Sequence, residues 1–125
     1  MIYPILLAVS LALGVAGDIY DVILTEKGLK AGVAAEGNQW LSSIVGTKPS
    51  AVGLYFRDSI VLALCVTPTA LCATVFHNLP LAYGALAGPV AYGAKHVLGG
   101  LQWRTLLNGG KLPTVQTAWQ KFLNW

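Results

Sequence analysis

The sequence is poor in charge, because only 10% of its 125 residues are Asp, Glu, Lys or Arg, against about 25% in an ordinary soluble domain. At the same time, 55% of the residues are apolar. A chain with so few charges cannot cover its own surface in water, and we therefore expect much of that surface to face lipid. The length allows one domain, residues 1–125.

The sequence also lacks the motifs that specify chemistry. It has no Gly-rich phosphate loop after a strand pattern, no nucleophile elbow and no Cys–His zinc spacing. The basic residues are scattered, which argues against nucleic acid as a partner. Cys65 and Cys72 lie about 10 Å apart along a helix, too far for a disulfide. No catalytic residue and no cofactor are therefore predicted.

Long apolar runs are what the sequence does contain. Three of them, at about 2–24, 51–76 and 79–101, reach the roughly 20 residues that a membrane-spanning helix needs. Only His77 and Asn78 separate the last two, which predicts an antiparallel hairpin. The expected fold is an all-α polytopic membrane protein with three transmembrane helices. The first run lacks the basic start of a signal peptide, and we expect it to be retained, with cleavage as the alternative.

The basic residues outside these runs fix the expected orientation. They fall in the loop after the first run and in the tail after the third. The positive-inside rule then places the N-terminus outside and the C-terminus in the cytoplasm. Within the tail, residues 112–125 have the spacing of an amphipathic helix with aromatic anchors, which predicts an interfacial helix.

Small residues mark a packing face in the third run. Gly84 and Gly88 are spaced so that two helix backbones can approach closely. The partner helix belongs either to the same chain or to another copy, and the sequence leaves both open.

Ionisable residues inside the apolar runs form the candidate site. All lie at a similar depth, near the cytoplasmic ends: Asp18, Asp21, Arg57, Asp58, Lys95 and His96. Such residues are costly in a bilayer and are functional candidates by default. They either hold the helices together as ion pairs, or form a site for an ion, a proton or a lipid headgroup. No metal site is expected, because His77 falls on the other side of the membrane from this cluster, and because Arg57 and Lys95 would oppose a hard cation held by the carboxylates.

The segment after the first run carries a family resemblance. Asp21, Thr25, Gly28-Leu29, Gly32, Glu36 and Asn38 follow one another in a pattern that resembles an uncharacterised family of small prokaryotic three-span membrane proteins. That family has Pro where this chain has Gln39. The resemblance implies a three-span fold in a prokaryotic inner membrane and singles out Thr25, Glu36 and Asn38, but implies no activity.

These features favour a non-enzymatic membrane protein. We expect a structural or accessory subunit that contacts membrane lipid and assembles with copies of itself or with a larger membrane complex. A small channel or transporter, including a membrane-lesion protein, is the alternative, and it would use the cluster of ionisable residues. An enzyme acting on lipid headgroups, with Asp21, Asp58 and His96 as acid–base groups, is the third possibility.

Overall fold

The computed structural model describes residues 2–32 and 50–110, and every regular element within them is a helix. There are four such helices in these residues: α1 Ile2–Ala31, α3 Ala51–Thr74, α4 Leu79–Ala85 and α5 Ala87–Leu107. The expected all-α class is thus confirmed for the described residues. The helix expected over 112–125 lies outside them.

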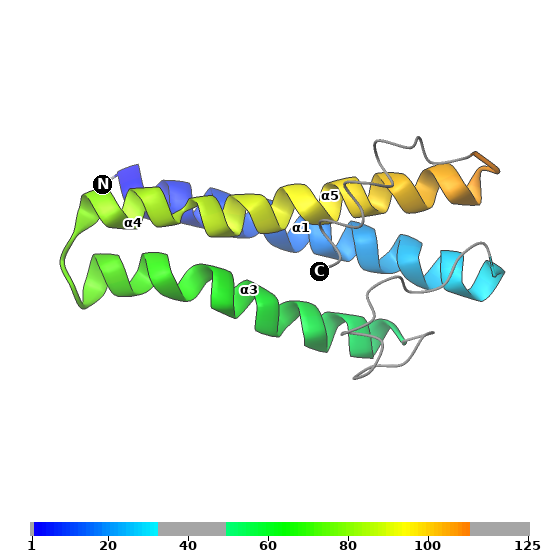
Figure 1. The fold of residues 1–125 in the computed structure, drawn as a ribbon, viewed down its shortest axis with the longest axis horizontal. Helices are drawn as coiled ribbons and strands as arrows, with labels where there is room; N and C mark the ends of the chain where they lie inside the picture. The colour runs from blue at the N-terminus through cyan, green and yellow to red at the C-terminus, as the bar shows by residue number, and fades with distance from the viewer. Residues whose placement is uncertain (1, 33–49, 111–125) are drawn as a thin grey trace.

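The four helices form three rods, because α4 and α5 follow one another almost in line (Figure 1). The rods run up, down and up: α1 and the α4–α5 rod are parallel, and α3 runs between the two ends in the opposite direction. Helix α1 packs along α5, whereas α3 packs mainly on α4. The N-terminus and the connection between α3 and α4 therefore lie at the same end of the molecule, which we call the hairpin end.

Local hydrogen bonds explain where the hairpin turns. Helix α3 ends at Thr74, and His77 has a φ of 49°, the left-handed backbone that reverses the chain. The side chain of Asn78 then accepts a hydrogen bond from the backbone N–H of Leu81 at 3.1 Å, and Pro80 lies in the first turn of α4. The expected antiparallel hairpin is present, with the turn at the expected residues.

A proline explains why the third rod has a break. Pro89 has no N–H and cannot donate to the carbonyl of Ala85, the last residue of α4. Helix α4 closes instead with a tight hydrogen bond from the N–H of Leu86 to the carbonyl of Tyr83 at 3.2 Å. Helix α5 begins directly afterwards and continues to Leu107, six residues beyond the end expected for the third apolar run.

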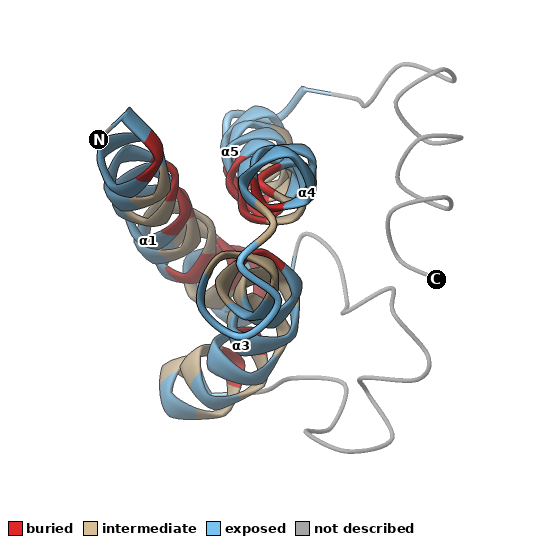
Figure 2. Ribbon diagram, turned by 90° about the vertical axis from the view of Figure 1, so that its left-hand side faces the viewer, coloured by how far each residue is buried: buried red, intermediate tan, exposed pale blue. Residues whose placement is uncertain are grey.

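Two of the described helices, α1 and α3, are long and apolar enough to cross a membrane. The distribution of side chains between the interior and the surface agrees with this property. The buried residues of α1 are mostly small or polar, among them Ser10, Gly14, Gly17 and Thr25, and they form one stripe that faces the other rods (Figure 2). The exposed residues include many large apolar side chains, such as Ile5, Leu13, Phe56, Leu64 and Val90.

Candidate functional site

Two glycines bring α1 and α5 together at the level of the candidate site. A Cβ on Gly17 would lie 3.1 Å from the carbonyl oxygen of Gly93, closer than nearly all real Cβ contacts. A Cβ on Gly93 would likewise lie 3.3 Å from the Cα of Gly14. The absence of side chains at these positions lets the two backbones nearly touch. The residues that follow on each helix, Asp18 and His96, are consequently held side by side.

His96 on α5 is the centre of the polar contacts. Its Nδ1 lies 2.7 Å from Oδ2 of Asp21 and 3.8 Å from Oδ1 of Asp18, both on α1. The hydroxyl of Thr25 donates a hydrogen bond to the other carboxylate oxygen of Asp21 at 3.2 Å. Only 3% of the His96 side chain is exposed. Because an ionised carboxylate can only accept, the short contact to Asp21 places a proton on Nδ1 and leaves the lone pair of a neutral ring on Nε2.

Asp58 brings α3 into the same cluster. Its side chain is 3% exposed, and Oδ1 accepts a hydrogen bond from Nε of Arg57 at 2.6 Å. Tyr92 connects α5 to this point, because its hydroxyl donates to the backbone carbonyl of Asp58 at 3.3 Å. The Tyr92 ring also lies against the His96 ring, with 4.4 Å between the ring centroids. Tyr92 therefore positions both Asp58 and His96.

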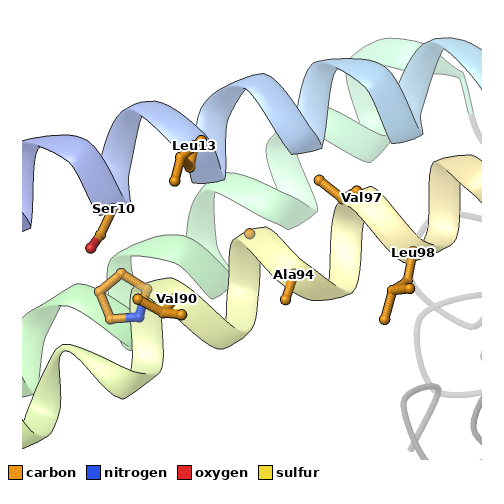
Figure 3. A pocket seen from close by; sticks show the side chains of 8 residues that line it. Ser10, Leu13, Val90, Ala94, Val97 and Leu98 are labelled. Atoms are coloured by element: carbon orange, nitrogen blue, oxygen red, sulfur yellow. The ribbon is translucent and has the colours of Figure 1, made fainter.

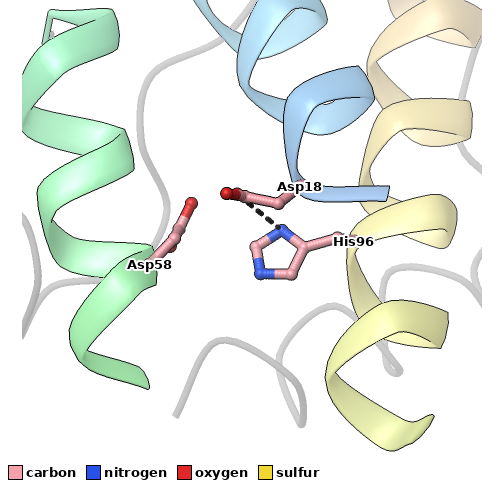
Figure 4. Close-up of side chains that lie close together, drawn as sticks. All are labelled: Asp18, Asp58 and His96. Atoms are coloured by element: carbon pink, nitrogen blue, oxygen red, sulfur yellow. Dashed lines mark ion pairs between the residues drawn. The ribbon is translucent and has the colours of Figure 1, made fainter. Parts of the chain in front are cut away.

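Two carboxylate oxygens in this cluster have no hydrogen-bond partner among the described residues. They are Oδ1 of Asp18 and Oδ2 of Asp58, and both atoms are buried. Figure 4 shows the two carboxyl groups pointing toward each other across the space between α1 and α3, with the imidazole of His96 beside them. One ligand atom from each of Asp18, Asp58 and His96 lies within 4.8 Å of the other two. Buried acceptors without partners are rare and costly in folded proteins, and these two converge on one point.

The charges of the cluster do not cancel. Three carboxylates, from Asp18, Asp21 and Asp58, and one guanidinium, from Arg57, give a formal charge of −2 while His96 is neutral. Charge is expensive to bury at such low exposure unless it is neutralised. The cluster therefore has the composition of a site that takes up positive charge, either as protons or as a cation.

The structure brings together five of the six ionisable residues that the sequence singled out. The sixth, Lys95, is half-buried on α5, and its ammonium makes no ion pair or hydrogen bond with the described part of the chain. Of the loop motif, Thr25 contacts Asp21, whereas Glu36 and Asn38 lie outside the described residues.

The two glycines of the expected packing face have different surroundings. A Cβ on Gly88 would lie 2.7 Å from the carbonyl oxygen of Cys65 on α3, so this glycine packs within the chain. A Cβ on Gly84 would have no atom within 4 Å among the described residues. The break at Leu86 separates the two positions, so that they do not continue one helical face.

Sequence reasoning missed Tyr92 and the glycines of α1 as parts of the site. A signal for the glycines is present: small or polar residues recur every three or four positions along the first apolar run, at Ser10, Gly14, Gly17, Asp21, Thr25 and Gly28. This spacing marks one face of a helix, and in an apolar helix it indicates the face that packs against protein. Tyr92 has no comparable signal, because its role depends on how α5 is rotated against α3.

A groove lies on the surface between α1 and α5. It has a volume of about 460 Å³ and is lined mainly by apolar side chains, including Leu13, Val90 and Leu98 (Figure 3). Its one hydroxyl, from Ser10, donates to the backbone carbonyl of Leu6 at 2.7 Å. The groove has no ionisable lining residue. It therefore offers none of the chemistry found in the buried cluster.

The cluster can hold a proton between two carboxyl groups or a metal ion between carboxylate and imidazole ligands. Comparison with protein-family models, with curated proteins and with solved structures finds no match to this chain.

Proposed function

We propose that the protein is a three-span integral membrane protein that binds a cation, either a proton or a metal ion, in the buried cluster and moves it through the membrane. The main observation behind this proposal is a pair of buried carboxylate oxygens, on Asp18 and Asp58, that have no hydrogen-bond partner among the described residues and lie beside the imidazole of His96. A protein that only needed these helices held together would gain nothing from leaving the two oxygens unpaired, because each costs free energy.

The three-span architecture is supported by the lengths of the rods. At 1.5 Å per residue, α3 is about 36 Å long and the α4–α5 rod about 40 Å, and either length exceeds the roughly 30 Å of hydrocarbon in a bilayer. The outward-facing side chains of all three rods include large apolar residues, among them Leu13, Leu64 and Leu98. In this arrangement, the polar cluster is the part of the interior that lipid cannot reach.

The depth of the cluster suits a site that exchanges with one side of the membrane. Asp58 lies about 10 Å from the start of α3. From Asp18, polar contacts lead through His96 and Asp21 to Thr25, with separations of 3.8, 2.7 and 3.2 Å. This sequence of groups runs toward the end of α1 that bears Lys27 and Lys30, the end that the positive-inside rule places in the cytoplasm.

A flux measurement tests the proposal. The full-length chain is reconstituted into liposomes that hold a pH-sensitive dye, with a parallel set that holds a dye for divalent cations. We expect a flux of one of these cations from the wild type and its loss in Asp58→Asn, which keeps the shape of the side chain and removes the charge. His77→Gln, at the exposed turn of the hairpin, is the control and should retain the flux.

The competing proposal is the structural or accessory subunit that the small-residue packing face, the amphipathic tail and the lack of catalytic motifs favoured. Wild-type liposomes without flux of either cation, together with a stable assembly of the chain extracted from native membranes, would reject transport and support that role. The apolar character of the exposed helix faces fits either proposal. The unpaired carboxylate oxygens of Asp18 and Asp58 favour the first.

A further inference from the structure

We infer that the cation bound by the cluster is a divalent first-row transition metal ion, held by Asp18, Asp58 and His96. This inference deepens the proposed function, on which it rests, by naming the class of cation. It is carried by three observations: the kinds of donor atom, the charge of the cluster and the hydrogen bond that orients the histidine.

The donor atoms select the class of ion. The three side chains supply two carboxylate oxygens and one imidazole nitrogen. Calcium and magnesium are normally held by oxygen ligands alone. Imidazole favours zinc, iron, nickel and copper, and carboxylate favours manganese, so a mixed set favours ions such as Zn²⁺, Fe²⁺ or Mn²⁺.

The separation of the donor atoms is compatible with this class. Bonds from zinc to histidine nitrogen or carboxylate oxygen are about 2.0–2.2 Å long, so two ligands of one ion lie at most about 4.4 Å apart. The donor atoms of Asp18, Asp58 and His96 lie within 4.8 Å of one another. The ring nitrogen that contacts Asp18 is Nδ1, at 3.8 Å, so closing the site around an ion on Nε2 requires rotation of the ring as well as of the two carboxyl groups.

The charge balance favours a divalent ion. The formal charge of the cluster, −2 from three carboxylates and Arg57, is neutralised by one M²⁺ ion with His96 neutral. Arg57 contacts Oδ1 of Asp58, while Oδ2 of the same carboxylate has no hydrogen-bond partner among the described residues, and the carboxyl group points toward Asp18 (Figure 4). The guanidinium therefore occupies one oxygen of Asp58 and leaves the other as a ligand.

The contacts around His96 match those of a metal-binding histidine. Such a ring usually donates its second N–H to a carboxylate, which fixes its orientation and makes the ligating nitrogen more basic. Asp21 accepts this hydrogen bond from Nδ1 at 2.7 Å and is itself held by Thr25. Asp21 thus acts as a positioning residue, and Tyr92 supports the ring from its face.

Direct binding to the full-length chain tests the inference. The protein is reconstituted in lipid nanodiscs, stripped of metal and titrated with Zn²⁺ by calorimetry, and with Co²⁺ by visible absorption, which reports the coordination of the ion. We expect one ion per chain. Asp58→Asn and His96→Gln should each weaken binding by about 100-fold or more, while His77→Gln, which changes the other histidine, should bind like the wild type. Asp21→Asn should weaken binding by about 10- to 100-fold, as loss of an orienting contact does.

The thermal stability of the wild type provides a second measurement that does not depend on any variant folding. An ion that binds only the folded chain raises its melting temperature, so Zn²⁺ should raise it and an equal concentration of Mg²⁺ should not. The inference is overturned if the wild type binds no metal, if Mg²⁺ binds as tightly as Zn²⁺, or if folded Asp58→Asn and His96→Gln bind normally. Proton flux without metal binding would overturn this inference and leave the proposed function standing, whereas metal binding without any flux would do the reverse.

Discussion

Polar groups lie between the apolar helices toward both ends of the bundle, but they are neutral toward one end and charged toward the other. At the hairpin end, the hydroxyls of Tyr3 and Thr69 lie 2.8 Å apart, and Thr69 donates to the backbone carbonyl of Ala82 at 2.7 Å. These contacts join α1, α3 and α4 with neutral groups, and the hydroxyls of both residues are hydrogen bonded. Further toward the other end, Asp18, Asp58 and His96 bring charged or ionisable groups of α1, α3 and α5 together, and two of their oxygens are unpaired among the described residues.

The two regions therefore differ in what it costs to bury their polar groups. A neutral network that is fully hydrogen bonded costs little to bury and fixes the packing of three helices. A cluster with excess negative charge is costly until it takes up a positive one. We therefore expect changes at the cluster to have large effects that depend on the cation, and changes at the hairpin end to have small effects on stability alone.

Removal of the Arg57 charge, which pairs with Asp58, should lower the free energy of unfolding more than any other change considered. Arg57→Met leaves the Asp58 carboxylate buried without its guanidinium, and the breaking of a buried ion pair in this way costs about 3–5 kcal/mol. The free energy of unfolding, measured by SDS titration in mixed micelles, should fall by that order. The double variant Arg57→Met/Asp58→Leu should recover most of the loss, because the cluster then carries the same formal charge as in the wild type.

An exposed ion pair of the same kind provides the control for this prediction. Lys30 contacts Glu26 at 2.8 Å, with 75% of the lysine side chain exposed, and Lys30→Met should change stability by less than about 0.5 kcal/mol. Equal losses in Arg57→Met and Lys30→Met would show that Asp58 does not depend on Arg57 for its charge, and the contrast between the two ends would lose its electrostatic basis.

A substitution that separates α3 from α5 should have an intermediate effect on stability and on metal affinity. Gly88→Ala places a Cβ 2.7 Å from the backbone carbonyl of Cys65, where no flexible side chain can move aside. Such overpacking costs about 1–3 kcal/mol. It should also pull Asp58 away from His96, so stability and metal affinity should fall together, by SDS titration and by calorimetry.

Gly84→Ala is the matched control, because the added methyl meets no atom within 4 Å among the described residues. Both substitutions raise the intrinsic helix propensity equally. Only Gly88→Ala is expected to destabilise the protein. If the two variants behaved alike, the close approach of α5 to α3 at Gly88 would not determine the geometry of the cluster.

The sequence was sufficient to predict the helices and the hairpin, because both depend on local chemistry. The length of the apolar runs indicates helices, and the short His77-Asn78 connection requires the reversal that the structure shows. The sequence also identified every ionisable residue of the cluster, because a charged residue within an apolar run is recognisable without a structure.

The convergence of those residues could not be predicted, because it depends on how each helix is rotated about its axis. Lys95 and His96 are neighbours in the sequence, yet His96 lies in the cluster and Lys95 does not. The expectation of no metal site rested on the placement of His77 across the membrane and on the charges of Arg57 and Lys95, and it stays untested. The sequence alone could not place one imidazole beside carboxylates from two other helices, because that arrangement depends on packing.

A substitution at the hairpin end should have the smallest effect on the free energy of unfolding. Thr69→Val removes the hydroxyl that bridges Tyr3 and Ala82, but the Tyr3 hydroxyl can still donate to the backbone carbonyl of residue 69, now 3.1 Å away. Hydrogen bonds between membrane helices contribute about 0.6 kcal/mol on average, and the free energy of unfolding should fall by roughly that amount. Thr67→Val loses only a hydrogen bond to Ala63 within its own helix, and its free energy of unfolding should fall by less.

Cation binding by Thr69→Val tests whether the hairpin end is independent of the cluster. The Thr69 network shares no hydrogen bond with the cluster among the described residues, so Thr69→Val should bind Zn²⁺ with wild-type affinity in the same calorimetric titration that separates Asp58→Asn from the wild type. A large loss of affinity in Thr69→Val would mean that the two ends are coupled through the rotation of α3. The neutral end would then be part of the binding mechanism, because it would set the angle at which Asp58 faces Asp18 and His96.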